Sequence, residues 1–150
     1  MAYQSTKTYG HSLGLSCAFR QWRAKSHCQL IHGYALSFKL VFESQSLDEN
    51  NWVVDFGSLK SLKAKLQENF DHTLLVAMDD PKKDVLLSLV DHGLAKVILV
   101  ESTGCEATAK YVFNMTEKWL CECGYSNVRL VSVEVAEHGA NSAVFVNSER

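Results

Sequence analysis

The 150-residue chain contains one proline, eight glycines and no long apolar run. With 47% hydrophobic residues, this composition excludes a low-complexity, collagen-like or disordered chain. No stretch approaches the roughly 18 apolar residues of a membrane span, and residues 1–10 lack the apolar core of a secretory signal. We therefore expect a cytoplasmic protein with no membrane partner, folded as a single domain over residues 1–150.

An excess of one charge is also missing, since 15 Lys and Arg residues stand against 17 Asp and Glu residues. Domains that follow phosphate backbones concentrate Lys and Arg and are usually strongly basic, so this balance argues against a nucleic-acid partner. The five cysteines are odd in number and include no Cys-x-x-Cys pair. This argues against a disulfide framework and against a zinc ribbon.

Hydrophobic periodicity predicts the order of the elements, with alternation for strands and helical spacing for helices. The predicted strands cover residues 8–19, 32–42, 96–100, 128–135 and 142–146. The predicted helices cover residues 55–70, 82–90 and 103–123. Asp55 is expected to cap the first helix. The order indicates an α+β fold with a largely antiparallel sheet and helices on one face.

The segment between the first two predicted strands, residues 20–31, is the densest polar part of the chain. It contains Arg20, Arg23, Lys25, His27 and Cys28. A thiol beside basic side chains is in a setting that lowers its pKa, so Cys28 is a candidate nucleophile or base. The alternative is a small buried filler, because free cysteine is among the most buried residue types.

Asp71 and His72 follow the first predicted helix, where the carboxylate could orient the imidazole for proton transfer. The alternative is a solvated helix end, at which histidine is favourable for dipole reasons alone. Glu106 and Glu137 are two further candidate carboxylates, for which the alternative is a solvated or capping role.

Five segments, in order, are spread along nearly the whole chain. They are Cys28-Gln-Leu-Ile-His32-Gly-Tyr34, Trp52-Val-Val-Asp-Phe-Gly-Ser-Leu-Lys60, Phe70-Asp71-His72-Thr-Leu74, Thr103-Gly-Cys-Glu106-Ala-Thr-Ala109 and Glu137-His-Gly-Ala-Asn-Ser-Ala-Val-Phe145. Together they resemble the motifs of the 6-pyruvoyl-tetrahydropterin synthase and 6-carboxy-tetrahydropterin synthase family. The resemblance implies the tunnelling fold (T-fold), in which subunits form a homo-oligomeric barrel with active sites between them.

The resemblance also implies a lyase that acts on 7,8-dihydroneopterin triphosphate. The expected product is 6-carboxy-5,6,7,8-tetrahydropterin, on the route to queuosine and other deazapurines. One alternative is an enzyme of the 6-pyruvoyl-tetrahydropterin synthase type or one acting on a related reduced pterin. The alternative from another class is a non-catalytic, oligomeric pterin-binding module.

By position, Cys28 resembles the family's catalytic cysteine, and Asp71 and His72 resemble its partners in proton transfer. Glu137 resembles the carboxylate that anchors the pterin ring and completes the catalytic set. The polar groups that the family brings near the pterin correspond to Thr103 and Glu106. Such a set is chemically coherent, because a thiolate can remove a proton, an oriented imidazole can return one, and a carboxylate can bind pterin N–H groups.

The metal site departs from the family pattern, in which three histidines hold zinc. Phe19 and Tyr34 stand at two of those positions, so that His32 alone is kept. Cys17, His27 or Tyr34 could supply the missing donors, since each carries a nitrogen, sulfur or oxygen. We therefore expect zinc, if used to polarise side-chain oxygens of the substrate, to be held weakly at a site around His32.

Overall fold

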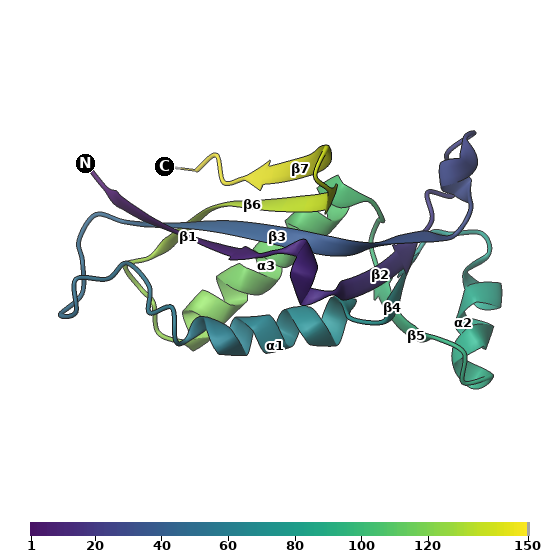
Figure 1. Ribbon diagram of the computed structural model, residues 1–150, viewed down its shortest axis with the longest axis horizontal. Coiled ribbons are helices and arrows are strands. Elements are labelled where there is room, and N and C mark those ends of the chain that lie inside the picture. The colour runs from purple at the N-terminus through teal and green to yellow at the C-terminus, as the bar shows by residue number, and fades with distance from the viewer. Residues whose placement is uncertain (150) are drawn as a thin grey trace.

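The computed structural model describes residues 1–149 and shows a seven-stranded sheet packed against helices (Figure 1). The strands are β1 (Tyr3–Tyr9), β2 (Leu15–Phe19), β3 (His32–Ser44), β4 (Thr73–Ala77), β5 (Lys96–Val100), β6 (Arg129–His138) and β7 (Asn141–Val146). The helices are α1 (Leu59–Phe70), α2 (Lys83–Asp91) and α3 (Cys105–Glu122), with short 3₁₀ turns η1 (His11–Leu13) and η2 (His27–Gln29). This is the α+β class that the periodicity predicts. The predicted placement of all helices on one face is wrong for α2, because Leu86 of α2 packs against Leu74 and Val76 of β4, whereas Leu75 points into the core under α1 and α3.

Strand β3 is the central strand of the sheet, because its thirteen residues pair with other strands along both of its edges. Its first part pairs with β2 and its second part with β1 along one edge, while β6 pairs along the other. Alternate side chains of β3 point into the core, among them Leu36, Phe38 and Leu40, which are almost completely buried. The alternation predicted over residues 32–42 is therefore confirmed.

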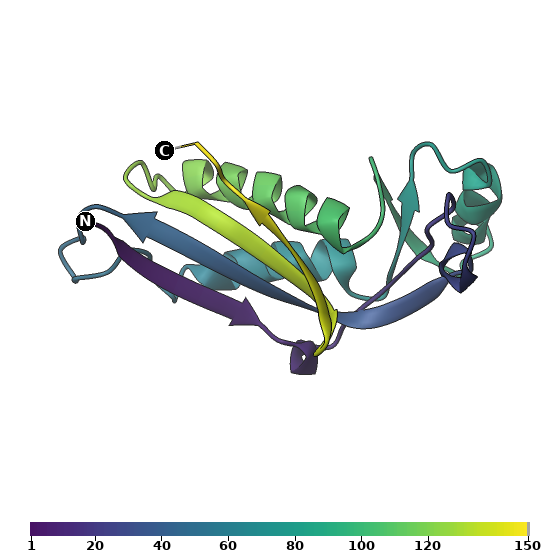
Figure 2. The same ribbon diagram turned by 90° about the horizontal axis from the view of Figure 1, so that it is seen from above.

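Helices α1 and α3 cover the same face of the sheet (Figure 2). Helix α1 buries Leu59, Leu62, Leu66 and Phe70, the spacing that the sequence predicts. The Phe70 ring packs against Phe38 of β3, with ring centroids 5.0 Å apart. Burying each large apolar side chain stabilises the fold by about 1.5–3 kcal/mol. None of the helices within residues 1–149 is long and apolar enough to cross a membrane.

The strand predicted over residues 8–19 is wrong as a single element. Two strands, β1 and β2, replace it, with the turn η1 between them. Both pair antiparallel with β3, β1 with residues 38–44 and β2 with residues 32–36. The chain therefore turns at η1, and the strands on both sides of the turn pair with β3.

Strand β4 was not among the predicted elements, and it changes the pairing of the sheet. It pairs parallel with both β2 and β5, so the sheet is mixed at this edge although its other pairs are antiparallel. All five β4 residues are buried. Its sequence is a continuous apolar run rather than an alternating one, which is the pattern of a strand covered on both faces.

Asp55 does not cap α1, which begins four residues later at Leu59. The Asp55 carboxylate instead accepts a hydrogen bond from the Gly57 amide at 2.8 Å, and so forms a turn before the helix. Phe56, expected on the apolar helix face, lies in this turn and is exposed. The Asx turn competes with the cap because an aspartate can bond to its own neighbouring backbone.

The Gly33 position allows β2 and β3 to approach closely. A β-carbon built at Gly33 would lie 2.7 Å from the backbone oxygen of Cys17 on β2. Gly33→Ala is expected to lower the free energy of unfolding by about 1–3 kcal/mol, because the backbone must move to accept the methyl group. Urea unfolding measures the loss. Gly10→Ala is the matched control, since no atom lies within 4 Å of its β-carbon, and equal losses in both variants would contradict the argument.

Candidate active site

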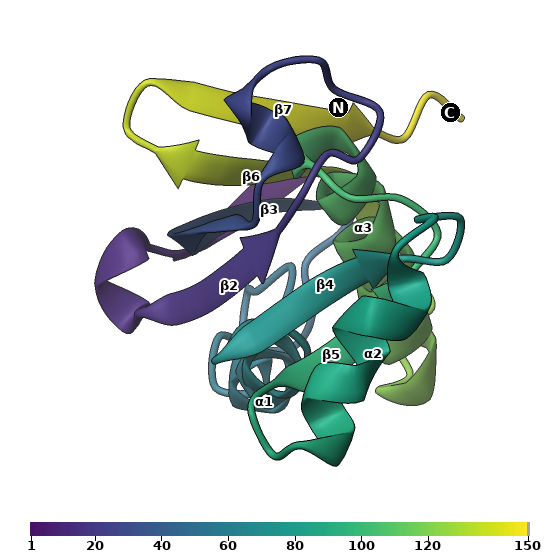
Figure 3. The same cartoon turned by 90° about the vertical axis from the view of Figure 1, so that its right-hand side faces the viewer.

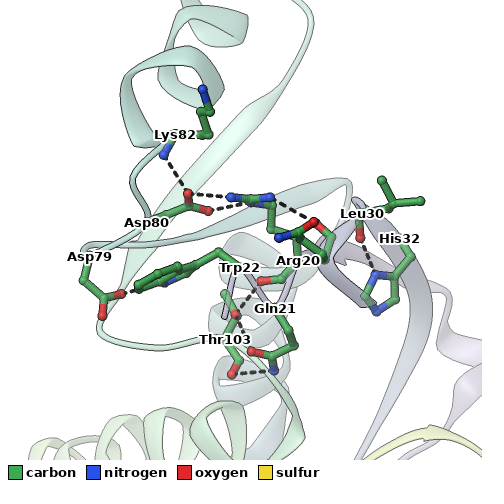
Figure 4. A network of polar contacts seen from close by, with 10 residues as sticks. Arg20, Gln21, Trp22, Leu30, His32, Asp79, Asp80, Lys82 and Thr103 are labelled. Carbon is green, nitrogen blue, oxygen red and sulfur yellow. Dashed lines mark hydrogen bonds and ion pairs between the residues drawn. The ribbon is translucent and has the colours of Figure 1, made fainter. Parts of the chain in front are cut away.

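The segment 20–31 between β2 and β3 is held in place by an ion pair with the turn after β4 (Figure 4). Arg20 donates from Nε and Nη2 to the Asp80 carboxylate at 2.8 and 3.0 Å, and from Nη1 to the backbone oxygen of Gln29 at 3.1 Å. The Arg20 hydrogen bond, together with one from the Lys82 amide, lowers the pKa of Asp80 below its ordinary value although burial opposes this. The pair therefore stays ionised at neutral pH.

A second anchor joins the same segment to the start of α3. The Thr103 hydroxyl donates to the backbone oxygen of Arg20 at 2.7 Å, and Gln21 Nε2 donates to the backbone oxygen of Thr103 at 2.9 Å. Gly104 suits this approach, because its φ of 106° is one that other residues rarely adopt and a β-carbon there would contact the Gln21 amide group. In this structure Thr103 therefore orders the segment that carries Cys28.

The arginines expected to face Cys28 are engaged with carboxylates instead. Arg20 binds Asp80, and Arg23 binds Asp79 at 3.3 Å while its guanidinium stacks over the Trp22 ring at 4.1 Å. Of the three basic residues in the segment, Lys25 makes no ion pair within residues 1–149. The basic setting that the sequence suggested for the thiol is therefore largely neutralised.

Cys28 lies in the turn η2, half-buried beside the start of β3. Its amide donates to the Ser26 hydroxyl at 3.3 Å, and its carbonyl accepts from the Gln21 amide at 2.9 Å. These two bonds close the loop and fix the backbone on either side of the thiol. The serine cap is the local reason that the chain forms a turn here.

Cys28 and Glu137 both lie near Tyr34, although they are far apart in sequence. The pKa of Tyr34 is raised, first by burial and then by the charge of Glu137, with smaller contributions from the neighbouring Cys28 and Cys105. Glu137 sits where the β6–β7 register shifts, at an irregularity between Ala136 and His138. Such bulges redirect a side chain, and they are common beside active sites.

Cys105 is the first residue of α3 and lies near Glu137. Burial raises the pKa of its thiol to about 12, with further contributions from the Glu137 charge and from a side-chain hydrogen bond to that carboxylate. Glu106, the neighbour of Cys105, is exposed in the first turn of α3, where a negative charge favours the helix. Of these two neighbours, Cys105 is therefore the one whose pKa is raised by Glu137, and the candidate Glu106 points to solvent.

An aromatic cluster adjoins these groups. Phe19 and His32 have ring centroids 5.1 Å apart, and those of His32 and Tyr34 lie 5.7 Å apart. Tyr34 also contacts the ring of His138 at 6.0 Å. His32 Nδ1 lies 2.7 Å from the backbone oxygen of Leu30, which orients its ring.

The residues considered as zinc ligands do not assemble into a metal site within one chain. Cys17 is opposite Tyr34 in the β2–β3 register, but it is 1% exposed and burial raises the pKa of its thiol to about 12. His27 is exposed in η2. Within residues 1–149, no three His, Cys, Asp or Glu side chains lie close enough together to hold a metal ion.

Asp71 and His72 form a contact of their own. His72 Nδ1 lies 2.8 Å from the Asp71 carboxylate, and 86% of the His72 side chain is exposed. Figures 1 and 3 show the α1–β4 junction on the other side of the β2–β3 ribbon from the turn η2. Within residues 1–149, no hydrogen bond, ion pair or ring contact joins the Asp71–His72 pair to Cys28 or Glu137.

Sequence reasoning missed two residues of this site. Cys105 contacts Glu137, and His138 packs on Tyr34, yet neither stood out. The sequence offers one indication for both residues: Cys105 is next to the candidate Glu106, and His138 is next to the candidate Glu137. The contacts join the start of α3, the irregular end of β6 and strand β3. No fixed spacing in a single sequence predicts contacts between such distant elements.

Solved structures with the same arrangement define the class of protein. An uncharacterized protein from Wolinella succinogenes superimposes with a TM-score of 0.83 at 20% identity over 99% of both chains. A Plasmodium vivax 6-pyruvoyltetrahydropterin synthase variant superimposes with a TM-score of 0.71 at 16% identity over 97% of both chains. The chain therefore has the α+β tunnelling fold that the resemblance implied.

Sequence comparison assigns the family. The profile described as 6-pyruvoyl tetrahydropterin synthase matches residues 11–148, so the chain belongs to that family. A 6-carboxy-5,6,7,8-tetrahydropterin synthase from Aquifex aeolicus is 26% identical over 97% of this chain and 98% of its own length. A protein of the same name from Rickettsia conorii is 35% identical over 37% of this chain and 41% of its own length.

The Arg20–Asp80 pair generates a prediction on stability and pH. Asp80→Asn is expected to lower the free energy of unfolding at pH 7 by about 1.5–3 kcal/mol, because a hydrogen bond to a charged group is lost. The folded pKa of Asp80 is depressed. Its contribution is therefore complete above the unfolded pKa of about 3.9 and is lost as the pH falls through the folded value.

The melting temperatures of wild type and Asp80→Asn should thus converge between pH 5 and pH about 2. Asp79→Asn is the matched control, because Asp79 and its partner Arg23 are mostly exposed and their pair should stabilise little. A difference between wild type and Asp80→Asn that does not change with pH would contradict the role of the ion pair.

Proposed function

We propose that the chain is a lyase that converts 7,8-dihydroneopterin triphosphate to 6-carboxy-5,6,7,8-tetrahydropterin, on a route to queuosine and other deazapurines. The observation that carries this proposal is that the Glu137 segment reaches Tyr34, just after the Cys28 turn, from more than a hundred residues away, since the ring centroids of Tyr34 and His138 lie 6.0 Å apart. The whole-chain similarity to the Aquifex aeolicus protein supports this product over others of the family.

The proposed chemistry divides the reaction among these groups. Glu137 accepts hydrogen bonds from the N–H groups of the pterin ring and so fixes its orientation. The Cys28 side chain, as thiolate, removes a proton from the side chain of the bound pterin. The triphosphate and a two-carbon fragment of that side chain leave, because the product keeps one side-chain carbon as its carboxyl group. His72, oriented by Asp71, returns a proton. Thr103 acts indirectly in this scheme, by holding the segment that carries Cys28.

We further propose that the protein works as a homo-oligomer with active sites between subunits. The support is that Asp71 and His72 lie apart from Cys28 in one chain, while the His72 ring is presented outward. Its φ of 51° belongs to the left-handed region, which is uncommon for residues other than glycine, although histidine enters it more often than most. Strained conformations of this kind cluster at functional sites.

The first test removes the two proton-transfer groups separately. Cys28→Ala and His72→Ala are each expected to lower the turnover of 7,8-dihydroneopterin triphosphate by about 10²- to 10⁴-fold, the usual contribution of a general acid or base. The product is quantified by chromatography. Cys121→Ala is the matched control, because this thiol is exposed near the far end of α3. Full activity of folded Cys28→Ala would remove the thiol from the mechanism.

Mixing the two inactive variants tests the intersubunit site. In an oligomer assembled from equal amounts of Cys28→Ala and His72→Ala chains, about one quarter of the sites would combine an intact Cys28 with an intact His72 from another chain. Activity should then return to about that fraction of wild type. No recovery, in mixtures shown by mass spectrometry to contain both chains, would indicate that each site lies within one chain.

The role of Glu137 is tested by binding. Glu137→Gln is expected to weaken the affinity for 7,8-dihydroneopterin by about 1.5–3 kcal/mol, because a charged hydrogen bond is replaced by a neutral one. Isothermal titration calorimetry gives the affinity. Glu134→Gln is the control on the same strand, since that carboxylate bonds to Ser142 instead. Unchanged affinity at an unchanged melting temperature would show that Glu137 does not anchor the pterin.

A second candidate function has one observation in its favour. Phe19 and Tyr34 stand at two positions where the family resemblance implies metal ligands, and a chain without the metal could still bind the ligand without turning it over. A non-catalytic pterin-binding module would keep its affinity for 7,8-dihydroneopterin. It would form no product at any metal concentration, and this distinguishes it from the lyase.

A further inference from the structure

The β2–β3 register puts Phe19 directly opposite His32. The family resemblance implies a zinc-binding histidine at the Phe19 position, but a phenyl ring has no atom that coordinates zinc. The ring is 2% exposed, and its centroid lies 5.1 Å from that of His32 and 6.3 Å from that of Tyr34. The place beside His32 is therefore filled by a packed hydrocarbon ring.

The remaining donors do not compensate for this loss. Cys17 is enclosed in the hydrophobic core, where a metal would have no room for an open coordination position. Tyr34 offers a neutral phenol, a weaker zinc ligand than the imidazole it replaces. The donor set on this face thus consists of one imidazole and one phenol, which does not fit the three protein ligands of a catalytic zinc site.

His32 and Tyr34 are well placed to bind one ligand group by hydrogen bonds. His32 Nδ1 lies 2.7 Å from the Leu30 carbonyl, so Nδ1 carries the proton of a neutral ring and Nε2 is left as an acceptor. Tyr34 projects from the same face of β3 two residues further on, with its ring edge-to-face with that of His32. One side chain can donate and the other can accept.

The Tyr34 hydroxyl differs from those of three other tyrosines. Tyr9, Tyr111 and Tyr125 bond to Leu59, Asn69 and Ser58, respectively. Within residues 1–149 the half-buried Tyr34 makes no such bond. A hydroxyl that makes no bond within the chain and is not sealed from solvent is free to bond to a ligand.

We propose that this site takes its pterin without zinc, and that the Tyr34 hydroxyl and His32 Nε2 bind a hydroxyl of the pterin side chain in place of the metal. A ligand hydroxyl both donates and accepts, so it can bond to the pair at once. Phe19 supports this pair by filling the metal position and packing against both rings. The choice of ligand rests on the proposed function, whereas the absence of zinc does not.

The absence of zinc is tested by measuring the number of zinc ions bound per chain. Wild-type protein is incubated with excess zinc, desalted and measured by inductively coupled plasma mass spectrometry, and we expect well below one zinc per chain. The double variant Phe19→His/Tyr34→His restores three imidazoles and is expected to retain about one zinc per chain. One retained zinc per wild-type chain, lost in His32→Ala, would overturn the proposal, and this measurement needs no change to the Phe19 core position. A folded double variant that retains no zinc would also overturn it.

The hydroxyl is tested by Tyr34→Phe, which keeps the ring and removes one polar atom. The affinity for 7,8-dihydroneopterin, measured by calorimetry in the presence of chelator, should fall about 2- to 12-fold, as expected for one hydrogen bond. Tyr3→Phe is the control, because Tyr3 is exposed on β1. Unchanged affinity of Tyr34→Phe would overturn the role of the hydroxyl. A wild type that binds no pterin would overturn this role together with the proposed function, and the zinc count would still decide the metal.

Discussion

At Gly33, strand β3 approaches β2 so closely that a β-carbon would lie 2.7 Å from the backbone oxygen of Cys17. This close pairing sets the register in which Phe19 faces His32 and Cys17 faces Tyr34. A shift of one residue would turn these side chains to the other face of the sheet. The contents of the candidate site therefore depend on a backbone contact that only glycine permits.

The site is ordered by polar contacts to its two flanks. On one flank, Arg20 and its neighbours bind the turn after β4 and the start of α3, and this holds the loop that carries Cys28. On the other flank, the irregular end of β6 brings Glu137 to Cys105. Tyr34 lies between the flanks on the long strand β3. The site thus depends on segments that are brought together by the sheet rather than by the chain.

Several elements could be predicted because their signals are local. Helix α1 follows from apolar residues at helical spacing, and the alternation from Leu36 to Phe42 predicts one buried face of β3. The break between β1 and β2 was missed because alternation continues across it. The start of α1 was misplaced because Asp55 has two uses, as a helix cap or in an Asx turn, and the choice between them depends on the surrounding structure.

The sequence by itself determined the fold class, the family and the types of reactive side chain, because the hydrophobic periodicity and the order of the motifs are properties of the sequence alone. Only the tertiary structure decided which groups meet. It paired Arg20 and Arg23 with carboxylates, put Cys105 beside Glu137, and left His72 apart from Cys28 within one chain. The physical reason is that pairing across a sheet and packing of a helix on it act between residues far apart in sequence, so no local pattern records their outcome.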